Sequence, residues 1–187
     1  MKKLLMAGIA AGMVAFGAAG TAHADNPVVM DQWYTFGFLG VGDALSSGIG
    51  YSPGTNPASI AAPDPAWTIT LTGAAYLTVV DGFNSGDRFS FDVNNDGVYD
   101  FTTSASSTGS SCGSDITGCL ANTNMSAGQF LLGAGSYQIV GRLDQGQPGA
   151  GVFQITAVPD QDVPEPASLA LLAAGLTGLA ASRRRRR

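Results

Sequence analysis

The sequence predicts an all-β domain, an antiparallel two-sheet β-sandwich of the jelly-roll kind. Three observations support this fold class. Residues 25–163 contain twenty glycines, their apolar residues alternate with polar ones in short runs, and no stretch keeps apolar residues at helical spacing for three turns. Alternation with a period of two is typical of half-buried strands. About eight such runs, separated by turn signals, are enough for two packed sheets.

The first four strands are predicted in the N-terminal half of this region. The first is Trp33–Phe38, and the second is Trp67–Thr72, which places three bulky apolar residues on one face and three threonines on the other. Short turns lead from the second run to Ala75–Val80 and then to Asp87–Val93. We therefore expect these last three runs to form consecutive antiparallel strands.

Four further runs complete the set of strands. They are Tyr99–Ala105, Gln129–Leu132, Ser136–Leu143 and Val152–Val158. The two long connections, 40–65 and 104–128, are rich in Gly, Ser, Pro and Asn. We expect them to be irregular loops at the ends of the sandwich.

Charge and residue content exclude several classes of function. Residues 25–163 carry thirteen Asp and two Arg with no Lys or Glu, a net charge of −11, which excludes nucleic acid as a partner. The one histidine, His23, lies in a segment that we expect to be removed, which excludes imidazole catalysis. The aspartates would allow hydrolysis by paired carboxylates, but the sequence singles out no pair. No catalytic residue is assigned, and we do not expect an enzyme.

Residues 1–24 have the pattern of a secretory signal peptide. Two lysines precede an uncharged run rich in Ala, Leu, Met and Gly, and small residues, Ala22 and Ala24, stand where signal peptidase requires them. Cleavage is therefore expected before Asp25. The alternative is an uncleaved membrane anchor, which the shortness of the run disfavours. The domain that remains is predicted to span residues 25–160.

Residues 161–187 combine a short motif, an apolar run and a basic end. Pro164, Glu165 and Pro166 precede the apolar residues 167–181. The chain then ends in five arginines, Arg183, Arg184, Arg185, Arg186 and Arg187. Fifteen helical residues cover only about 22 Å of a hydrocarbon core of about 30 Å, so a transient membrane anchor fits better than a permanent span.

This tail resembles the PEP-CTERM sorting signal of Gram-negative bacteria, which an exosortase recognises and cleaves during export. The resemblance implies an exosortase as a partner and transient anchoring in the inner membrane through the C-terminal helix. It also implies that the protein ends at the cell surface or outside the cell, often in an exopolysaccharide matrix or biofilm.

One loop contains a pattern of calcium ligands. The stretch 92–100 follows D-x-N-x-D-G-x-x-D, and its candidate ligands are Asp92, Asn94, Asp96, the carbonyl of Val98 and Asp100. Thr103 stands where the EF-hand pattern requires a bidentate Glu. The alternative is a plain hairpin turn at Asn95-Asp96-Gly97, chosen for positive φ.

Six residues separate the two cysteines, Cys112 and Cys119, inside a Ser/Gly loop. In an exported chain this spacing favours a disulfide that stiffens the loop. Free thiols or a metal pair are the alternatives.

Exposed aromatic side chains would provide a surface on which sugars stack. Trp33, Tyr34 and Tyr51 are the candidates, whereas Trp67 alternates in phase with apolar neighbours and is assigned to the core. The sequence therefore predicts a non-enzymatic surface or extracellular-matrix protein. The alternative is a carbohydrate-binding β-sandwich module that grips exopolysaccharide, with calcium as a candidate cofactor.

Overall fold

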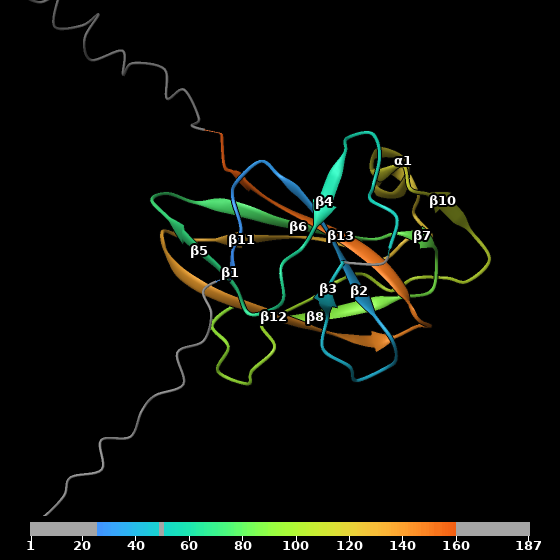
Figure 1. Cartoon of the computed structure of the whole chain (residues 1–187), viewed down its shortest axis with the longest axis horizontal. Helices are drawn as coiled ribbons and strands as arrows, with labels where there is room; N and C mark the ends of the chain where they lie inside the picture. Colours follow the sequence, from blue (N-terminus) through green and yellow to red (C-terminus); the bar gives the residue numbers. More distant parts are fainter. Residues whose placement is uncertain (1–25, 49–50, 160–187) are drawn as a thin grey trace, which may run out of the picture.

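The computed structural model describes residues 26–48 and 51–159. In it the chain folds into two packed sheets (Figure 1). The first sheet has the order β1 (Asn26–Pro27), β5 (Trp67–Leu71), β12 (Gly135–Gln145), β8 (Arg88–Asp92) and β9 (Phe101–Thr102). The second has the order β11 (Ala127–Leu132), β6 (Ala75–Asp81), β13 (Gly149–Ala157), β2 (Trp33–Phe38) and β3 (Ser46–Ser47), with β4 (Ser59–Ala61) also paired to β2. A small ribbon joins β7 (Phe83–Asn84) to β10 (Ser111–Gly113), and α1 (Ile116–Ala121) follows it. The predicted all-β sandwich is confirmed.

The pairing of β5, β6 and β8 differs from the prediction. Strands β5 and β8 both pair with β12, whereas β6 lies in the other sheet between β11 and β13. The expectation that these three runs are consecutive paired strands is therefore wrong. The short turns after β5 and β6 cross from one sheet to the other, and an alternating pattern specifies which face is buried but not which strand is the partner.

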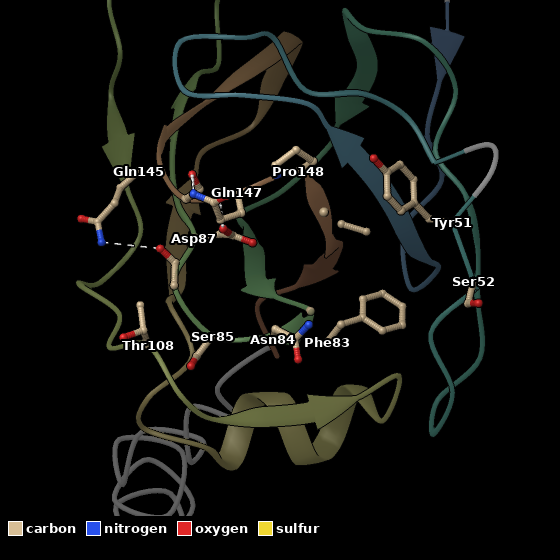
Figure 2. A pocket seen from close by; sticks show the side chains of 15 residues that line it. Tyr51, Ser52, Phe83, Asn84, Ser85, Asp87, Thr108, Gln145, Gln147 and Pro148 are labelled. Atoms are coloured by element: carbon tan, nitrogen blue, oxygen red, sulfur yellow. Dashed lines mark hydrogen bonds between the residues drawn. The ribbon is translucent and has the colours of Figure 1, made fainter.

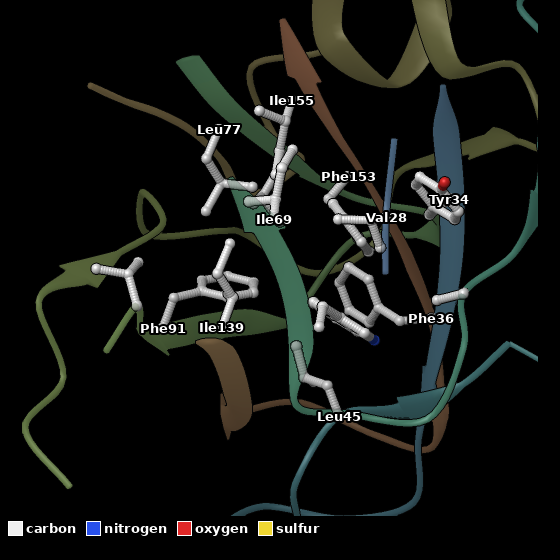
Figure 3. Close-up of a cluster of buried hydrophobic side chains, with 14 of the residues drawn as sticks. Val28, Tyr34, Phe36, Leu45, Ile69, Leu77, Phe91, Ile139, Phe153 and Ile155 are labelled. Atoms are coloured by element: carbon white, nitrogen blue, oxygen red, sulfur yellow. The ribbon is translucent and has the colours of Figure 1, made fainter. Parts of the chain in front are cut away.

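Aromatic side chains fill the space between the sheets (Figure 3). Trp67 of β5 stacks on Phe153 of β13, with ring centroids 4.3 Å apart. Phe36 of β2 meets the edge of Phe89 of β8 at a centroid distance of 5.2 Å. Each of these contacts joins one sheet to the other, and the assignment of Trp67 to the core is confirmed because its side chain is fully buried.

A second apolar cluster covers the outer face of the second sheet. It consists of Trp33, Val80, Ile116, Cys119, Met125 and Val152. The connection 104–128, predicted to be an irregular loop, supplies β10 and α1 to this cover. Asp115 caps α1, because its carboxylate accepts the Gly118 N–H at 3.1 Å. The connection 40–65 likewise contains β3 and β4, so both long connections are more ordered than expected.

The predicted disulfide is present and joins Cys112 of β10 to Cys119 of α1. Cys119 is buried in the second cluster, so the bridge fixes the cover to the sheet. Within the described ranges, no helix is long and apolar enough to cross a membrane. The apolar runs predicted at both ends of the chain lie outside those ranges.

Removing the bridge should weaken the fold. For a loop of this length, the chain-entropy model assigns the disulfide about 2–3 kcal/mol, so Cys112→Ser/Cys119→Ser should lower the free energy of unfolding by that amount. Urea unfolding measures the change. Thr123→Ala, at an exposed position of the same connection, is the matched control and should unfold like the wild type. Thiol labelling of both cysteines in the native protein without reductant would contradict the bridge.

Candidate functional site

A groove of about 710 Å³ opens at the end of the sandwich where β13 begins (Figure 2). We call it the polar groove, and its main side chains are Tyr51, Phe83, Asn84, Asp87, Gln145 and Gln147. Figure 2 shows the aromatic rings of Tyr51 and Phe83 on one side, and Asp87 with the two glutamines on the other. The volume lies in the range of small-molecule sites, and the two walls differ in chemistry.

Two aspartates meet beside this groove, and we call them the acidic pair. Asp81 is the last residue of β6 and is fully buried, and Asp87 immediately precedes β8 and lines the groove. Asp81 Oδ2 accepts the Asp87 N–H at 3.2 Å, whereas Asp81 Oδ1 is buried with no hydrogen-bond partner. An unpaired buried oxygen is rare in native proteins.

The turn between β12 and β13 closes on Asp87. The Gln147 N–H donates to Asp87 Oδ1 at 3.0 Å. Gly146, at φ +142°, permits this approach, because a Cβ there would lie 1.9 Å from Asp87 Oδ1. Any larger residue at this position would push the turn away from the carboxylate.

Burial dominates the electrostatics of the acidic pair. It raises the pKa of Asp81 from 3.8 to about 8, with the charge of Asp87 as the next cause, while the backbone N–H groups of Asp87 and Gly86 act in the opposite direction. Burial also raises the pKa of Asp87, and its hydrogen bond from Gln147 opposes that rise. Asp81 is therefore the main proton-binding site of the pair near neutral pH.

No positive charge compensates the acidic pair. The described part of the chain contains two arginines and no lysine or histidine. Arg142 pairs with Asp144 at 2.8 Å, and Arg88 donates through Nε to the carbonyl of Thr103 at 3.2 Å. Both guanidinium groups are thus engaged with other partners.

The predicted calcium loop, 92–100, is a tight turn held by its own carboxylates. Asp92 Oδ2 accepts the Gly97 N–H at 2.7 Å, and Asp92 Oδ1 accepts the N–H groups of Asn94 and Asp96 at 3.1 and 3.3 Å. Asp100 Oδ2 accepts the Val93 N–H. Asn95 and Gly97 have positive φ, as the hairpin alternative requires. Within the described residues no group of three or more acidic, His or Cys side chains is placed to hold a metal ion, so calcium binding here stays a prediction without structural support.

The three aromatic residues predicted to form a sugar-stacking surface do not lie together. Trp33 lies in the second apolar cluster, and Tyr34 stacks on Phe153 in the core at 5.2 Å. Both are buried, so the expectation that they offer faces to a sugar is wrong. Their strand is covered on both sides, which an alternating pattern does not reveal. Tyr51 alone of the three lines the polar groove.

Comparison with known proteins assigns the C-terminal tail. Residues 162–186 match the family model of the PEP-CTERM protein-sorting motif. The chain carries a PEP-CTERM sorting signal. The motif marks it as an exported protein that an exosortase sorts through transient membrane association in Gram-negative bacteria. No curated protein and no solved structure matches the chain.

The PEP-CTERM match spans Pro164-Glu165-Pro166 and Arg183 to Arg186, and Arg187 lies one residue beyond it. The roles expected of the individual residues stay predictions. These residues, and the signal-peptide residues Ala22 and Ala24, lie outside the described ranges. Cleavage by signal peptidase stays a prediction.

The sequence did not single out the acidic pair or Phe83. One signal was available: Asp81 ends a run of apolar residues that contains no basic residue, and such a position tends to bury a carboxylate without a counter-charge. The partner Asp87 could not be found in this way, because the contact depends on how the 82–86 segment folds back.

The acidic pair predicts that stability falls as the pH rises from 3.8 to about 8 in buffer containing EDTA. In this window the unfolded chain has released the Asp81 proton while the folded chain retains it, so the folded state binds more protons. The free energy of unfolding should fall by at most about 1.4 kcal/mol per pH unit for one proton. Urea unfolding across the pH range measures the slope.

Asp81→Asn should remove most of this slope, because the amide does not titrate. Asp64→Asn, at an exposed site, is the matched control and should keep the wild-type slope. An Asp81→Asn protein with the wild-type slope would contradict the assignment.

Proposed function

We propose that this exported protein is a non-enzymatic component of the cell surface or extracellular matrix, and that the polar groove is its binding site for extracellular polysaccharide. The sorting motif supports the location, because it directs the chain out of the cytoplasm. Signal peptidase and exosortase are the proposed processing partners, and the C-terminal apolar run is the proposed transient anchor.

The observation that carries the binding proposal is the contrast between the two walls of the groove. A pyranose ring has an apolar C–H face and a rim of hydroxyl groups. Tyr51 and Phe83 offer aromatic faces to the first, and Gln145, Gln147 and Asp87 offer donors and acceptors to the second (Figure 2). Among the residues that line the groove, polar groups at several points could fix the orientation of the sugar.

The backbone at Phe83 supports a role for its ring. Phe83 has a φ of +64°, which is unfavourable for any residue with a Cβ. The pairing of β7 with β10 and a hydrogen bond from Ser111 Oγ to the Phe83 carbonyl, at 2.6 Å, hold it there. Backbone strain of this kind concentrates at functional sites.

The placement of carboxylates supports binding in preference to hydrolysis. Glycoside hydrolysis generally needs two carboxyl groups that flank the scissile bond. Asp87 is the one acidic side chain among the described residues that line the groove. Asp81 is closed off behind it, with its unpaired oxygen buried.

Replacing the aromatic wall should weaken binding of the bacterium's own exopolysaccharide without unfolding the protein. Tyr51→Ala and Phe83→Gly should each reduce affinity by about tenfold, equivalent to about 1.4 kcal/mol. A glycan array followed by calorimetry measures this. Phe83→Gly should also be more stable than Phe83→Ala by about 1 kcal/mol, because glycine relieves the positive φ.

Tyr99→Ala is the matched control for the loss of an aromatic side chain. Tyr99 is half-exposed beneath Arg142, outside the groove, so its removal should leave affinity unchanged. Equal binding by all four variants, or no binding by the wild type, would reject the glycan site.

Processing provides a separate prediction. Intact-mass measurement of the secreted protein should give a chain that begins at Asp25 and lacks residues 183–187, because signal peptidase and exosortase remove the two ends. Secreted material that retains the five arginines would contradict exosortase cleavage.

A further inference from the structure

The unpaired oxygen of Asp81 indicates that the acidic pair lacks a ligand. Asp81 is fully buried, and its Oδ1 contacts no donor among the described residues. Folding has removed this oxygen from water, and apart from a proton shared with Asp87 no group among the described residues replaces the lost hydrogen bonds. A native structure tolerates such an atom most readily where a bound group satisfies it.

The carboxylate of Asp87 strengthens the case that the acidic pair binds a ligand. Asp87 is largely buried, and its Oδ1 already accepts the Gln147 N–H. Two neighbouring acidic groups thus lie in a low-dielectric environment, while both arginines of the described chain are engaged at other positions. Like charges in such a place repel unless a cation or a shared proton separates them.

We propose that Asp81 and Asp87 bind one divalent cation, Ca²⁺, which enters through the polar groove. The ligand atoms of both side chains are hard carboxylate oxygens, which excludes soft metals that prefer thiolate or imidazole. Ca²⁺ accepts six to eight oxygen ligands in flexible geometry, so groove water can complete a shell begun by two carboxylates. Mg²⁺ gives up its water reluctantly and fits a closed carboxylate such as Asp81 less well.

This site differs from the 92–100 turn. The oxygens of Asp92 already accept three backbone N–H groups, whereas Asp81 Oδ1 accepts none. The proposal does not depend on glycan binding, because the cation alone would satisfy the buried oxygen and cancel the repulsion.

Calcium titration of the purified full-length protein, freed of metal with EDTA and dialysed into mildly alkaline buffer, tests the proposal. Calorimetry should find one site with a Kd in the weak extracellular range, roughly 10⁻⁴ to 10⁻³ M. Asp81→Asn and Asp87→Asn should each weaken binding by at least about tenfold, because each removes a charged ligand. Mg²⁺ in the same assay should bind more weakly.

Asp96→Asn, in the 92–100 turn, is the matched control and should bind Ca²⁺ like the wild type. Near-UV circular dichroism verifies that each variant is folded, and Asp81→Asn should fold well because it removes a buried charge. Wild-type affinity in folded Asp81→Asn, or loss of binding in Asp96→Asn alone, would overturn the proposal and place the cation elsewhere. No binding at about 10 mM Ca²⁺, ten times the upper end of the expected range, would show that the pair shares a proton instead.

Discussion

The contacts of Trp67 with Phe153 and Phe36 hold the two sheets together, and the rest of the structure depends on this aromatic layer. Its rings come from β5, β13 and β2, strands that are far apart in the sequence. Burial of such large side chains is the main source of stability in a sandwich of this size. Because these strands are fixed, the loops at their ends are fixed too, and the polar groove forms where β13 begins.

The sequence was a good guide to the positions of strands and a poor guide to their partners. Strand β2 was predicted with its observed bounds, because four of its six residues are aromatic. Sheet membership was not predictable, since β5 and β6 have similar alternation yet lie in opposite sheets. That choice depends on which faces meet across the core, and no local pattern encodes it.

Burial on both faces of β2 explains the other main departure. Trp33 is covered by α1 and its connection, elements too short to show a helical period in the sequence. The disulfide was predictable because its two cysteines lie close together in the sequence. The turn at 92–100 was found for the same reason, since Asp92 bonds to amides within five residues of itself. The acidic pair needed the three-dimensional structure, because its unusual property is the absence of a partner for Asp81 Oδ1.

The course of β13 has a consequence for how the protein meets its surroundings. Gly149, at the start of this strand, lines the polar groove, and the chain leaves the sandwich beyond Ala157 at the other end. Nine residues of extended strand span about 30 Å. The groove therefore lies at the end of β13 opposite to the point where the chain continues towards the sorting signal. A ligand bound in the groove is thus separated by the length of β13 from Val158, where the chain leaves the sheet.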